Sequence, residues 1–574
     1  MSVARSSLAM AGGSIASRVL GIVRQSLIVA IIGQGLVGNA FQTANTLPNI
    51  IYVVIAGGVL NSVLVPQLVK AMAAKDGGRE YTDRLLTIAI GIFLVVTVVA
   101  TLGAGWLVRA YAASLRGSAL DLAVFFAVIT IPQIFAYALY GLLGQVLQAR
   151  GRFAVFGWSP ALANVVSIAG LLGFAALYRE QITSHAIEAP QSWTPEMVWW
   201  FAGTATLSIV AQALVLLVPL WRSGFRWRPR LGLRGVGLRA TSKVTAWAFA
   251  SLLVSQVAYL AASQVMWRAS GSSIRLPGQP FVAGVAAYSN ALLVFLVPHS
   301  LIALSLFTAL YPRISAAVRD RKTELVRRDY VQGLTVPAAL TVPSSVALVV
   351  FALPLMTLLF TSPDPAEVPA AALVLAALGL GVLPLGVDVL NQRILYAYEA
   401  GRSAFAAQLV LTLVALGVTG LALLVRPEWT AVTIALGLVV SNLVAAAYGM
   451  VQVRRRIGPY GGSTVVRTWV RMLFAASVAG LVASWPTAWL TDVSATWGRF
   501  GALLPLGVGG LLFAVVYVLL AVRMDVRELG DLLGPVADRV GRVLGPRLAR
   551  RGAAGRGGGG AAGGGEGGGR HRAR

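Results

Sequence analysis

The sequence predicts an all-α integral membrane protein with about fourteen transmembrane helices. Of its 574 residues, 57% are hydrophobic and only 12% are charged, and the mean hydropathy is +0.77. A soluble chain carries about 25% charged residues, twice the fraction found here. Apolar runs of about 20–30 residues, the length of a bilayer-spanning helix, recur along the chain. These observations exclude a soluble enzyme, a collagen-like chain and a wholly disordered chain.

The apolar runs predict the helices one by one. Open strands cannot span lipid because their edge amides would be unsatisfied, so each run is expected to be helical. The first run is too long for a signal-peptide core and contains Arg18 and Arg24, so we expect it to be retained. The runs occupy residues 8–32, 40–68, 85–108, 121–148, 156–178, 197–221, 244–267, 281–310, 332–360, 369–397, 403–425, 429–452, 468–490 and 500–522.

The loops alternate in their content of basic residues, and this alternation predicts the topology. Even-numbered loops are rich in Lys and Arg, whereas odd-numbered loops hold only scattered Arg. Because cytoplasmic loops carry the excess of Lys and Arg, both termini are predicted to be cytoplasmic. Most of the net charge of +26 is therefore loop charge that sets topology, and we expect no nucleic-acid partner.

Two short motifs recur and predict an internal repeat. Val63–Pro66 ends the second run, and the related Ala309–Pro312 ends the eighth. Gly151-Arg152 follows the fourth run, and Gly401-Arg402 follows the tenth. Both offsets shift the helix count by six, which keeps the two halves in the same orientation. Parallel repeats of this kind are a known transporter architecture with the substrate site between the repeats.

The repeat predicts two six-helix lobes, two further helices and a tail. From Gly552 onward the sequence is rich in Gly and Arg without apolar periodicity, so the tail is expected to be largely disordered. The predicted units are an N-lobe at 1–223, a basic cytoplasmic linker at 224–243, a C-lobe at 244–453, helices thirteen and fourteen at 454–523, and a cytoplasmic tail at 524–574.

Two arginines lie deep in the first run. On a helical wheel, Arg18 and Arg24 share an arc of about 120° with Ser17 and Gln25, opposite an apolar face. An ionisable residue within the membrane is costly and therefore indicates a functional site. We predict that both arginines face a cavity. The alternative is that they snorkel to the cytoplasm or pair structurally.

The second run has a polar face without charge, and polar residues recur in the eighth. We predict that these side chains line the same cavity, with interhelical hydrogen bonding as the alternative. The predicted cavity-lining polar residues are Ser17, Gln25, Asn39, Asn45, Asn49 and Asn290.

The tenth run carries Asp388, the one acid well inside a predicted span, and Glu399 follows it. Both are candidates for coupling or gating. The alternatives for Asp388 are an ion pair with Arg393 and exposure near the cytoplasmic end.

The chain lacks the usual motifs of catalysis and cofactor binding. It has no Cys, its three His residues show no metal-ligand spacing, and no Lys follows a Gly as a phosphate-binding loop requires. We therefore expect no enzyme activity, no metal and no cofactor. A monovalent cation gradient, the membrane potential or downstream consumption of substrate would drive transport.

The order and spacing of several motifs resemble the MurJ/MviN-type lipid II flippases, within the superfamily that includes multidrug extruders and polysaccharide exporters. The resemblance covers about residues 1–523. The motifs are Ser17-Arg18-Val19-Leu20-Gly21 with Arg24, Leu47-Pro48-Asn49, Gly58-Val59-Leu60, Val65-Pro66, Leu147-Gln148-Ala149-Arg150-Gly151-Arg152-Phe153 before Pro160, and Pro298 with Pro312.

The resemblance implies a two-lobed flippase in a bacterial cell membrane, with a central cationic cavity. It would carry the undecaprenyl-pyrophosphate-linked peptidoglycan precursor (lipid II) from the inner to the outer leaflet by alternating access. Arg18 and Arg24 match arginines that are proposed to hold the pyrophosphate. Asn39 stands where the family often has an acid, so the charge of the cavity would rest mainly on Arg18 and Arg24. Further partners would be membrane lipids and proteins of cell-wall synthesis or division.

Two other functions stay open. One is a related exporter of another polysaccharide-linked lipid or of an amphiphilic drug. The other is a scaffold for envelope synthesis that transports nothing and recruits its partners through the tail.

Overall fold

The computed structural model describes residues 3–56, 79–150, 153–224, 227–230, 243–271, 280–526 and 528–530. Every regular element in these ranges is a helix, and the predicted all-α membrane fold is confirmed. The motifs Val63–Pro66 and Gly151-Arg152, most of the predicted basic linker and the tail from residue 531 lie outside the described residues.

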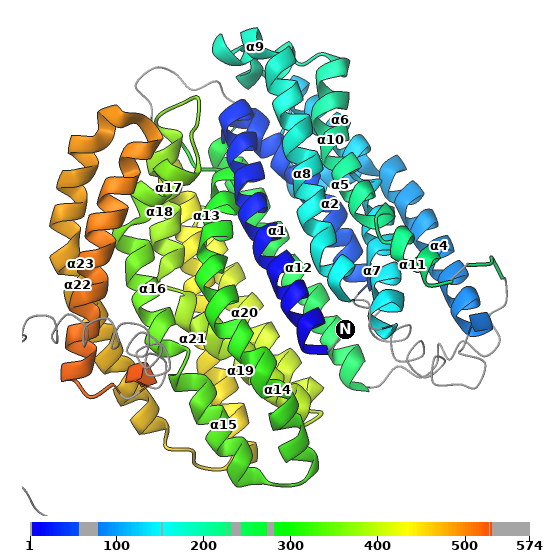
Figure 1. The fold of residues 1–574 in the computed structure, drawn as a ribbon. Coiled ribbons are helices and arrows are strands. Elements are labelled where there is room, and N and C mark those ends of the chain that lie inside the picture. Colours follow the sequence, from blue (N-terminus) through cyan, green and yellow to red (C-terminus); the bar gives the residue numbers. More distant parts are fainter. Residues whose placement is uncertain are drawn as a thin grey trace, which may run out of the picture.

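The helices from α1 to α11 gather on one side of the molecule and are called the N-lobe below (Figure 1). Their bounds are α1 (Val3–Ile32), α2 (Leu36–Ile55), α4 (Arg79–Leu102), α5 (Ala104–Tyr111), α6 (Gly117–Thr130), α7 (Gln133–Ala149), α8 (Phe153–Leu177), α9 (Arg179–Thr183), η2 (Ala186–Glu188), η3 (Pro190–Ser192), α10 (Pro195–Leu214) and α11 (Leu217–Arg222).

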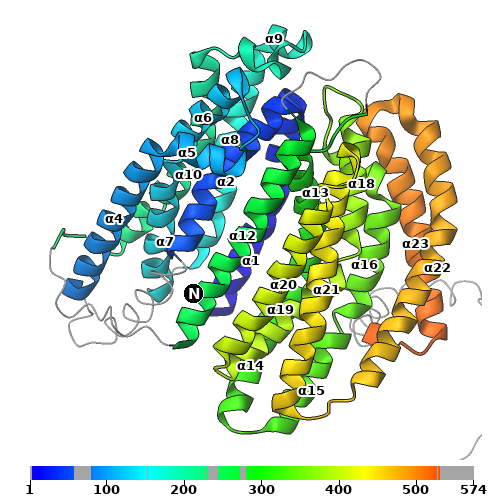
Figure 2. The same cartoon turned by 180° about the vertical axis from the view of Figure 1, so that it is seen from behind.

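The helices from α12 to α21 gather on the other side and are called the C-lobe. An antiparallel pair, α22 (Gly462–Ser494) and α23 (Leu503–Arg523), is joined by η6 (Ala495–Ala502) and covers the outer edge of the C-lobe (Figures 1 and 2). The C-lobe comprises α12 (Lys243–Ser270), α13 (Val285–Pro298), η4 (His299–Ala303), α14 (Leu304–Arg319), α15 (Thr323–Thr335), α16 (Ala338–Val350), α17 (Ala352–Leu359), α18 (Glu367–Gly379), α19 (Val382–Ala397), α20 (Gly401–Leu421), η5 (Pro427–Trp429) and α21 (Thr430–Ile457).

The fold has the apolar helices that a multi-pass membrane protein needs. Among the described residues, eleven helical segments are long and apolar enough to cross a membrane, or up to twelve if the bent pair α18–α19 is one span. The antiparallel helices α22 and α23 fall within a single one of these segments, Gly462–Arg523. The polar helix α2 is absent from them and carries Asn39, Asn45 and Asn49. Each of the fourteen predicted runs nevertheless coincides with a helix or a broken helix over its described part.

Breaks within the runs follow from proline and glycine. Pro132 separates α6 from α7, because proline lacks an N–H and its ring clashes with the preceding turn. The helices α18 and α19 meet at 48° beside Gly381. Pro298 ends α13 and is followed by the π-helical turn η4. Such turns often occur at functional positions, and η4 supplies Ser300 to the interface between the lobes.

The two lobes are packed together near the turn Gly33–Gly35 between α1 and α2, called the junction end below. One continuous apolar core there combines Phe41 and Phe126 of the N-lobe with Trp267 and Phe295 of the C-lobe. The helix α1 runs between the lobes (Figure 1), so its side chains can reach both. The fold therefore places α1, which carries the predicted polar face, at the boundary between the two lobes.

Candidate functional site

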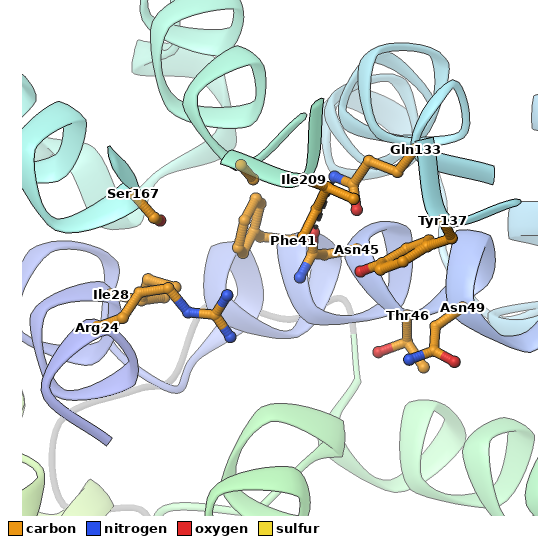
Figure 3. Close-up of a pocket in the computed structure, with 11 residues that line it drawn as sticks. Arg24, Ile28, Phe41, Asn45, Thr46, Asn49, Gln133, Tyr137, Ser167 and Ile209 are labelled. Carbon is orange, nitrogen blue, oxygen red and sulfur yellow. Dashed lines mark hydrogen bonds between the residues drawn. The ribbon is translucent and has the colours of Figure 1, made fainter. Parts of the chain in front are cut away.

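Arg24 faces a small polar cavity inside the N-lobe. The cavity has a volume of about 190 Å³ and lies between α1, α2, α7, α8 and α10. Figure 3 shows the Arg24 guanidinium and the Tyr137 hydroxyl directed toward one another across this space. The lining residues are Arg24, Ile28, Phe41, Asn45, Thr46, Asn49, Gln133, Tyr137, Ser167, Ala205 and Ile209.

Amide and hydroxyl groups surround the guanidinium. Gln133 Nε2 lies 3.4 Å from Asn45 Oδ1 and 3.2 Å from Thr206 Oγ1, so it bridges α2 and α10. Thr46 Oγ1 accepts from Gln42 Nε2 at 3.2 Å. Each side-chain amide has two N–H donors and a carbonyl oxygen, so the wall can donate hydrogen bonds to a ligand without adding charge.

The charge of the cavity is not balanced. Its lining contains one cation and no carboxylate, and Arg24 Nε is buried without a hydrogen-bond partner among the described residues. Arg24 is half-buried, so it loses part of its hydration at a cost in free energy, because no partner replaces the lost water. A guanidinium binds phosphate oxygens through two parallel N–H···O bonds. The arrangement is therefore suited to a phosphate-containing anion.

Arg18 contacts the opposite lobe. It is exposed, and its Nη1 donates a hydrogen bond to Ser300 Oγ of η4. Its neighbour Ser17 ties α1 to α8, because Asn164 Nδ2 donates to the Ser17 carbonyl oxygen at 2.8 Å. Arg18 and Arg24 lie about 9 Å apart along the helix axis and have different contacts. In this structure, one faces the C-lobe and the other the N-lobe cavity.

The other predicted polar residues fall into two groups. Asn45 and Asn49 line the cavity with Arg24. Gln25 and Asn290 instead connect the lobes, since Gln25 Nε2 donates to Asn290 Oδ1 at 2.8 Å. Asn39 also connects them, because its buried Oδ1 accepts from the backbone N–H of Ala286 at 2.8 Å. The sequence pattern alone does not separate these two groups.

The two predicted coupling residues occupy contrasting positions. Asp388 is buried in α19, where Gln392 Nε2 donates to its Oδ2 at 2.7 Å while Oδ1 has no partner among the described residues. Arg393 lies over the ring of Tyr311. Glu399 is exposed in the turn after α19. Within the described ranges, no group of three or more His, Cys, Asp or Glu side chains is placed to hold a metal.

Several site residues are not among those predicted. Gln133 and Tyr137 lie four apart on α7, so a helical wheel of the fourth run would have placed them on one face. Ser300 lies in the π-helical turn that follows Pro298 and accepts a hydrogen bond from Arg18. Glu367, at the start of α18, is 3% exposed and contacts the turn between α1 and α2. No local pattern in the sequence indicates that contact.

Comparison with known proteins identifies similar chains. The family model described as "Lipid II flippase MurJ" matches residues 28–508. The "Lipid II flippase MurJ" of Burkholderia cenocepacia is 29% identical over 394 residues, which cover 67% of this chain and 71% of that protein. The "Probable lipid II flippase MurJ" of Vibrio cholerae is 25% identical over 549 residues, which cover 91% and 96%.

Solved structures show the same fold. The chain superimposes on "Lipid II flippase MurJ, inward closed conformation" with a TM-score of 0.67 at 17% identity, covering 90% of this chain and 99% of that one. A second match, to the "Inward-facing conformation of a multidrug resistance MATE family transporter of the MOP superfamily", has a TM-score of 0.62 at 17% identity and covers 78% and 96%. At these identities, the likeness concerns the fold.

Proposed function

The chain belongs to the lipid II flippase MurJ family of transporters, and we propose that it moves lipid II, the undecaprenyl-pyrophosphate-linked peptidoglycan precursor, from the inner to the outer leaflet of a bacterial plasma membrane. The lobes would alternate between states open to one side and then the other. Both termini would lie in the cytoplasm, which puts the junction end on the extracytoplasmic side. The protein is a multi-pass membrane protein.

The observation that carries this proposal is the unbalanced charge of Arg24. A half-buried guanidinium among neutral amides is a strong site for the diphosphate of a lipid-linked precursor, because charge-assisted hydrogen bonds strengthen where water is partly excluded. Pockets for drug-sized ligands measure about 300–1,000 Å³. The cavity of about 190 Å³ therefore suits the diphosphate alone, while the sugar and peptide would occupy space outside it.

Arg18 is the second proposed contact to the substrate. In this structure, Ser300 Oγ accepts its hydrogen bond, and a neutral hydroxyl is easily replaced by a phosphate oxygen. Engagement of Arg18 would free the contact between α1 and η4, and this links substrate binding to the interface between the lobes. A carrier of cationic drugs fits less well, since the described lining of the cavity has no carboxylate.

A monovalent cation gradient or the membrane potential is the proposed driving force. Asp388 supports the first choice, because a buried carboxylate with an unpartnered oxygen can take up a cation or proton. The exposed Glu399 would act, if at all, near the cytoplasmic surface. Membrane lipids and proteins of cell-wall synthesis or division are the further proposed partners.

The test is complementation of bacteria depleted of their own lipid II flippase, combined with an assay of lipid II accessibility in the outer leaflet. The wild-type chain should restore growth and accessibility. Arg24→Ala and Arg18→Ala should each abolish both at normal membrane levels. Arg467→Ala, which removes an exposed arginine from α22, is the matched control and should behave as wild type. Rescue by both Arg18→Ala and Arg24→Ala would show that the arginines do not hold the diphosphate.

A further inference from the structure

A buried acid from the C-lobe holds the turn between the first two helices of the N-lobe. Glu367 begins α18 and is only 3% exposed. Its Oε2 accepts a hydrogen bond from the backbone N–H of Gln34 at 2.5 Å and another from Ser362 Oγ. Gln34 lies in the N-lobe and Ser362 in the C-lobe, so a single carboxylate oxygen is bonded from both sides of the interface.

The turn is shaped to receive this carboxylate. Gly33 has a φ of +68°, a left-handed conformation that glycine adopts without steric cost. A Cβ at Gly33 would lie 3.2 Å from both carboxylate oxygens, and one at Gly35 would lie 3.3 Å from Oε1. The two glycines thus let the carboxylate approach the backbone. The N-terminus of α2 also has no side-chain cap, because its N-cap residue is Gly35.

The charge of Glu367 is balanced by hydrogen bonds rather than by a cation. No ion pair joins it to a basic side chain within the described part of the chain. The charged groups with an electrostatic effect on Glu367 are two other acids, Asp364 of the same lobe and Glu188 of the N-lobe. Glu188 belongs to η2, which packs over α1 and α2. A carboxylate among acids is unfavourable when dry, so the Gln34 N–H is a contact that the closed interface requires.

Other contacts between the lobes cluster around the same turn. Asn290 Nδ2 donates to Gln34 Oε1 at 3.0 Å, so both the backbone and the side chain of Gln34 are held by the C-lobe. Trp267 Nε1 donates to Thr43 Oγ1 at 3.0 Å. These groups lie beside the apolar core that joins the lobes at the junction end. Separation of the lobes at this end must break all of these bonds.

We propose that Glu367 is the latch of the extracytoplasmic gate, meaning the residue that holds the gate closed. Its bond to the Gln34 N–H keeps the lobes together at the junction end and is released when the transporter opens outward. The assignment of this end to the outside rests on the proposed function. On opening, water would hydrate the carboxylate and the freed N–H, which makes the latch reversible. Glu367 touches no substrate in this scheme and acts as a positioning residue for α1 and α2.

The test measures the separation of the lobes directly and needs no substrate. Because the chain has no Cys, spin labels can be attached at Ser184→Cys in the N-lobe and Leu424→Cys in the C-lobe, both exposed positions toward the junction end. Double electron–electron resonance on the purified full chain in lipid nanodiscs then reports the distance distribution. Glu367→Ala should lower the ratio of the closed to the open population at least tenfold, which corresponds to about 1.4 kcal/mol.

A conservative variant and a control variant distinguish a residue that holds the lobes together from one that only stabilises the local fold. Glu367→Gln keeps a carbonyl oxygen that can accept from Gln34, so it should fall between wild type and Glu367→Ala, and it serves if the alanine variant does not fold. Glu428→Gln removes an acid that pairs with Arg426 at 3.0 Å within the C-lobe and should leave the distribution unchanged.

One result overturns the proposal: Glu367→Ala and Glu367→Gln give the wild-type distance distribution, whether or not their melting temperatures fall. Failure of the flippase assignment would appear instead in the complementation assay. That assay can fail for the wild-type chain while the latch variants still shift the distances.

Discussion

Replacing Arg24 by methionine should separate stability from function. The substitution keeps an unbranched side chain of similar reach and removes the charge from a cavity that holds no acid among its described lining residues. Replacing a buried ion pair with apolar groups of similar volume is often neutral or stabilising by about 1–4 kcal/mol, and a charge without a partner lacks even the attraction within such a pair. The cavity can hold water, which reduces the cost of the charge, so we expect the low end of that range, about 1–2 kcal/mol.

The loss of function should be large. Two charge-assisted hydrogen bonds between a guanidinium and a phosphate contribute about 1.5–3 kcal/mol each, so binding of a diphosphate should weaken by roughly a hundredfold or more. Arg24→Lys keeps the charge and loses the paired donors, so it should retain part of the affinity. The expected signature is a variant that is at least as stable as wild type and does not bind.

The assay is thermal unfolding of the purified protein with and without inorganic pyrophosphate. A ligand that binds only the folded state stabilises it by about 2.7 kcal/mol at a hundred times its Kd. Wild type should therefore melt at a higher temperature with pyrophosphate, and Arg24→Met should melt at the same temperature with or without it. An equal pyrophosphate shift in both proteins, or a marked loss of stability without ligand, would refute the reasoning.

Four further predictions concern other parts of the molecule. Asn290→Ala removes hydrogen bonds to two N-lobe glutamines and should cost about 1–3 kcal/mol, seen as a lower melting temperature; an unchanged one would contradict it. Asp388→Asn should remove any dependence of lipid II flipping on a cation gradient, and flipping that keeps this dependence would exclude Asp388 from coupling. Gly480→Val should separate α22 from α16 and lower the melting temperature by several degrees, because a Cβ there already lies 2.6 Å from Val346 Cγ1; a wild-type melting curve would show that the contact can relax. Deletion of residues 552–574 should leave complementation intact, whereas a scaffold acting through its tail would fail.

Periodicity and composition were sufficient to predict the helices. The apolar runs mark them because lipid requires about 20 apolar residues per crossing and internal satisfaction of every backbone group. Helix breaks such as the one at Pro132 depend only on the local residue type, so they can be predicted from the sequence. The polar face of the first run predicted that both arginines face a cavity, since charge in an apolar segment must avoid lipid. In the structure Arg24 lines a cavity, while Arg18 donates to Ser300 of the C-lobe.

Which polar residue meets which partner could not be predicted in the same way. Asn45 and Asn39 lie on the same polar helix, yet one lines a cavity and the other binds the backbone of Ala286. The difference depends on where the C-lobe sits, and that position is set by contacts between residues hundreds of positions apart. Glu367 is the clearest case, because its partner Gln34 is 333 residues away and contributes only a backbone N–H.

Arg24 and Glu367 together indicate how this chain uses its few buried charges. Neither has an ion-pair partner among the described residues, and they lie in different places, the first in the N-lobe cavity and the second at the junction end. Burial of a charge without a partner lowers stability, so a fold selected for stability alone would replace Arg24 by an apolar residue, whereas hydrogen bonds from Gln34 and Ser362 hold Glu367 in the closed interface. A transporter, in contrast, needs groups that are poorly satisfied in one state and better satisfied in the next, because only differential stabilisation shifts a conformational equilibrium. Arg24 would gain its partner when a diphosphate enters, and Glu367 would exchange its bond to the Gln34 N–H for water when the gate opens. The two charges therefore act at different steps, the first on substrate binding and the second on the closed gate. The double variant Arg24→Met, Glu367→Ala should populate the open state as Glu367→Ala does in the distance measurement, and its melting temperature should not change with pyrophosphate.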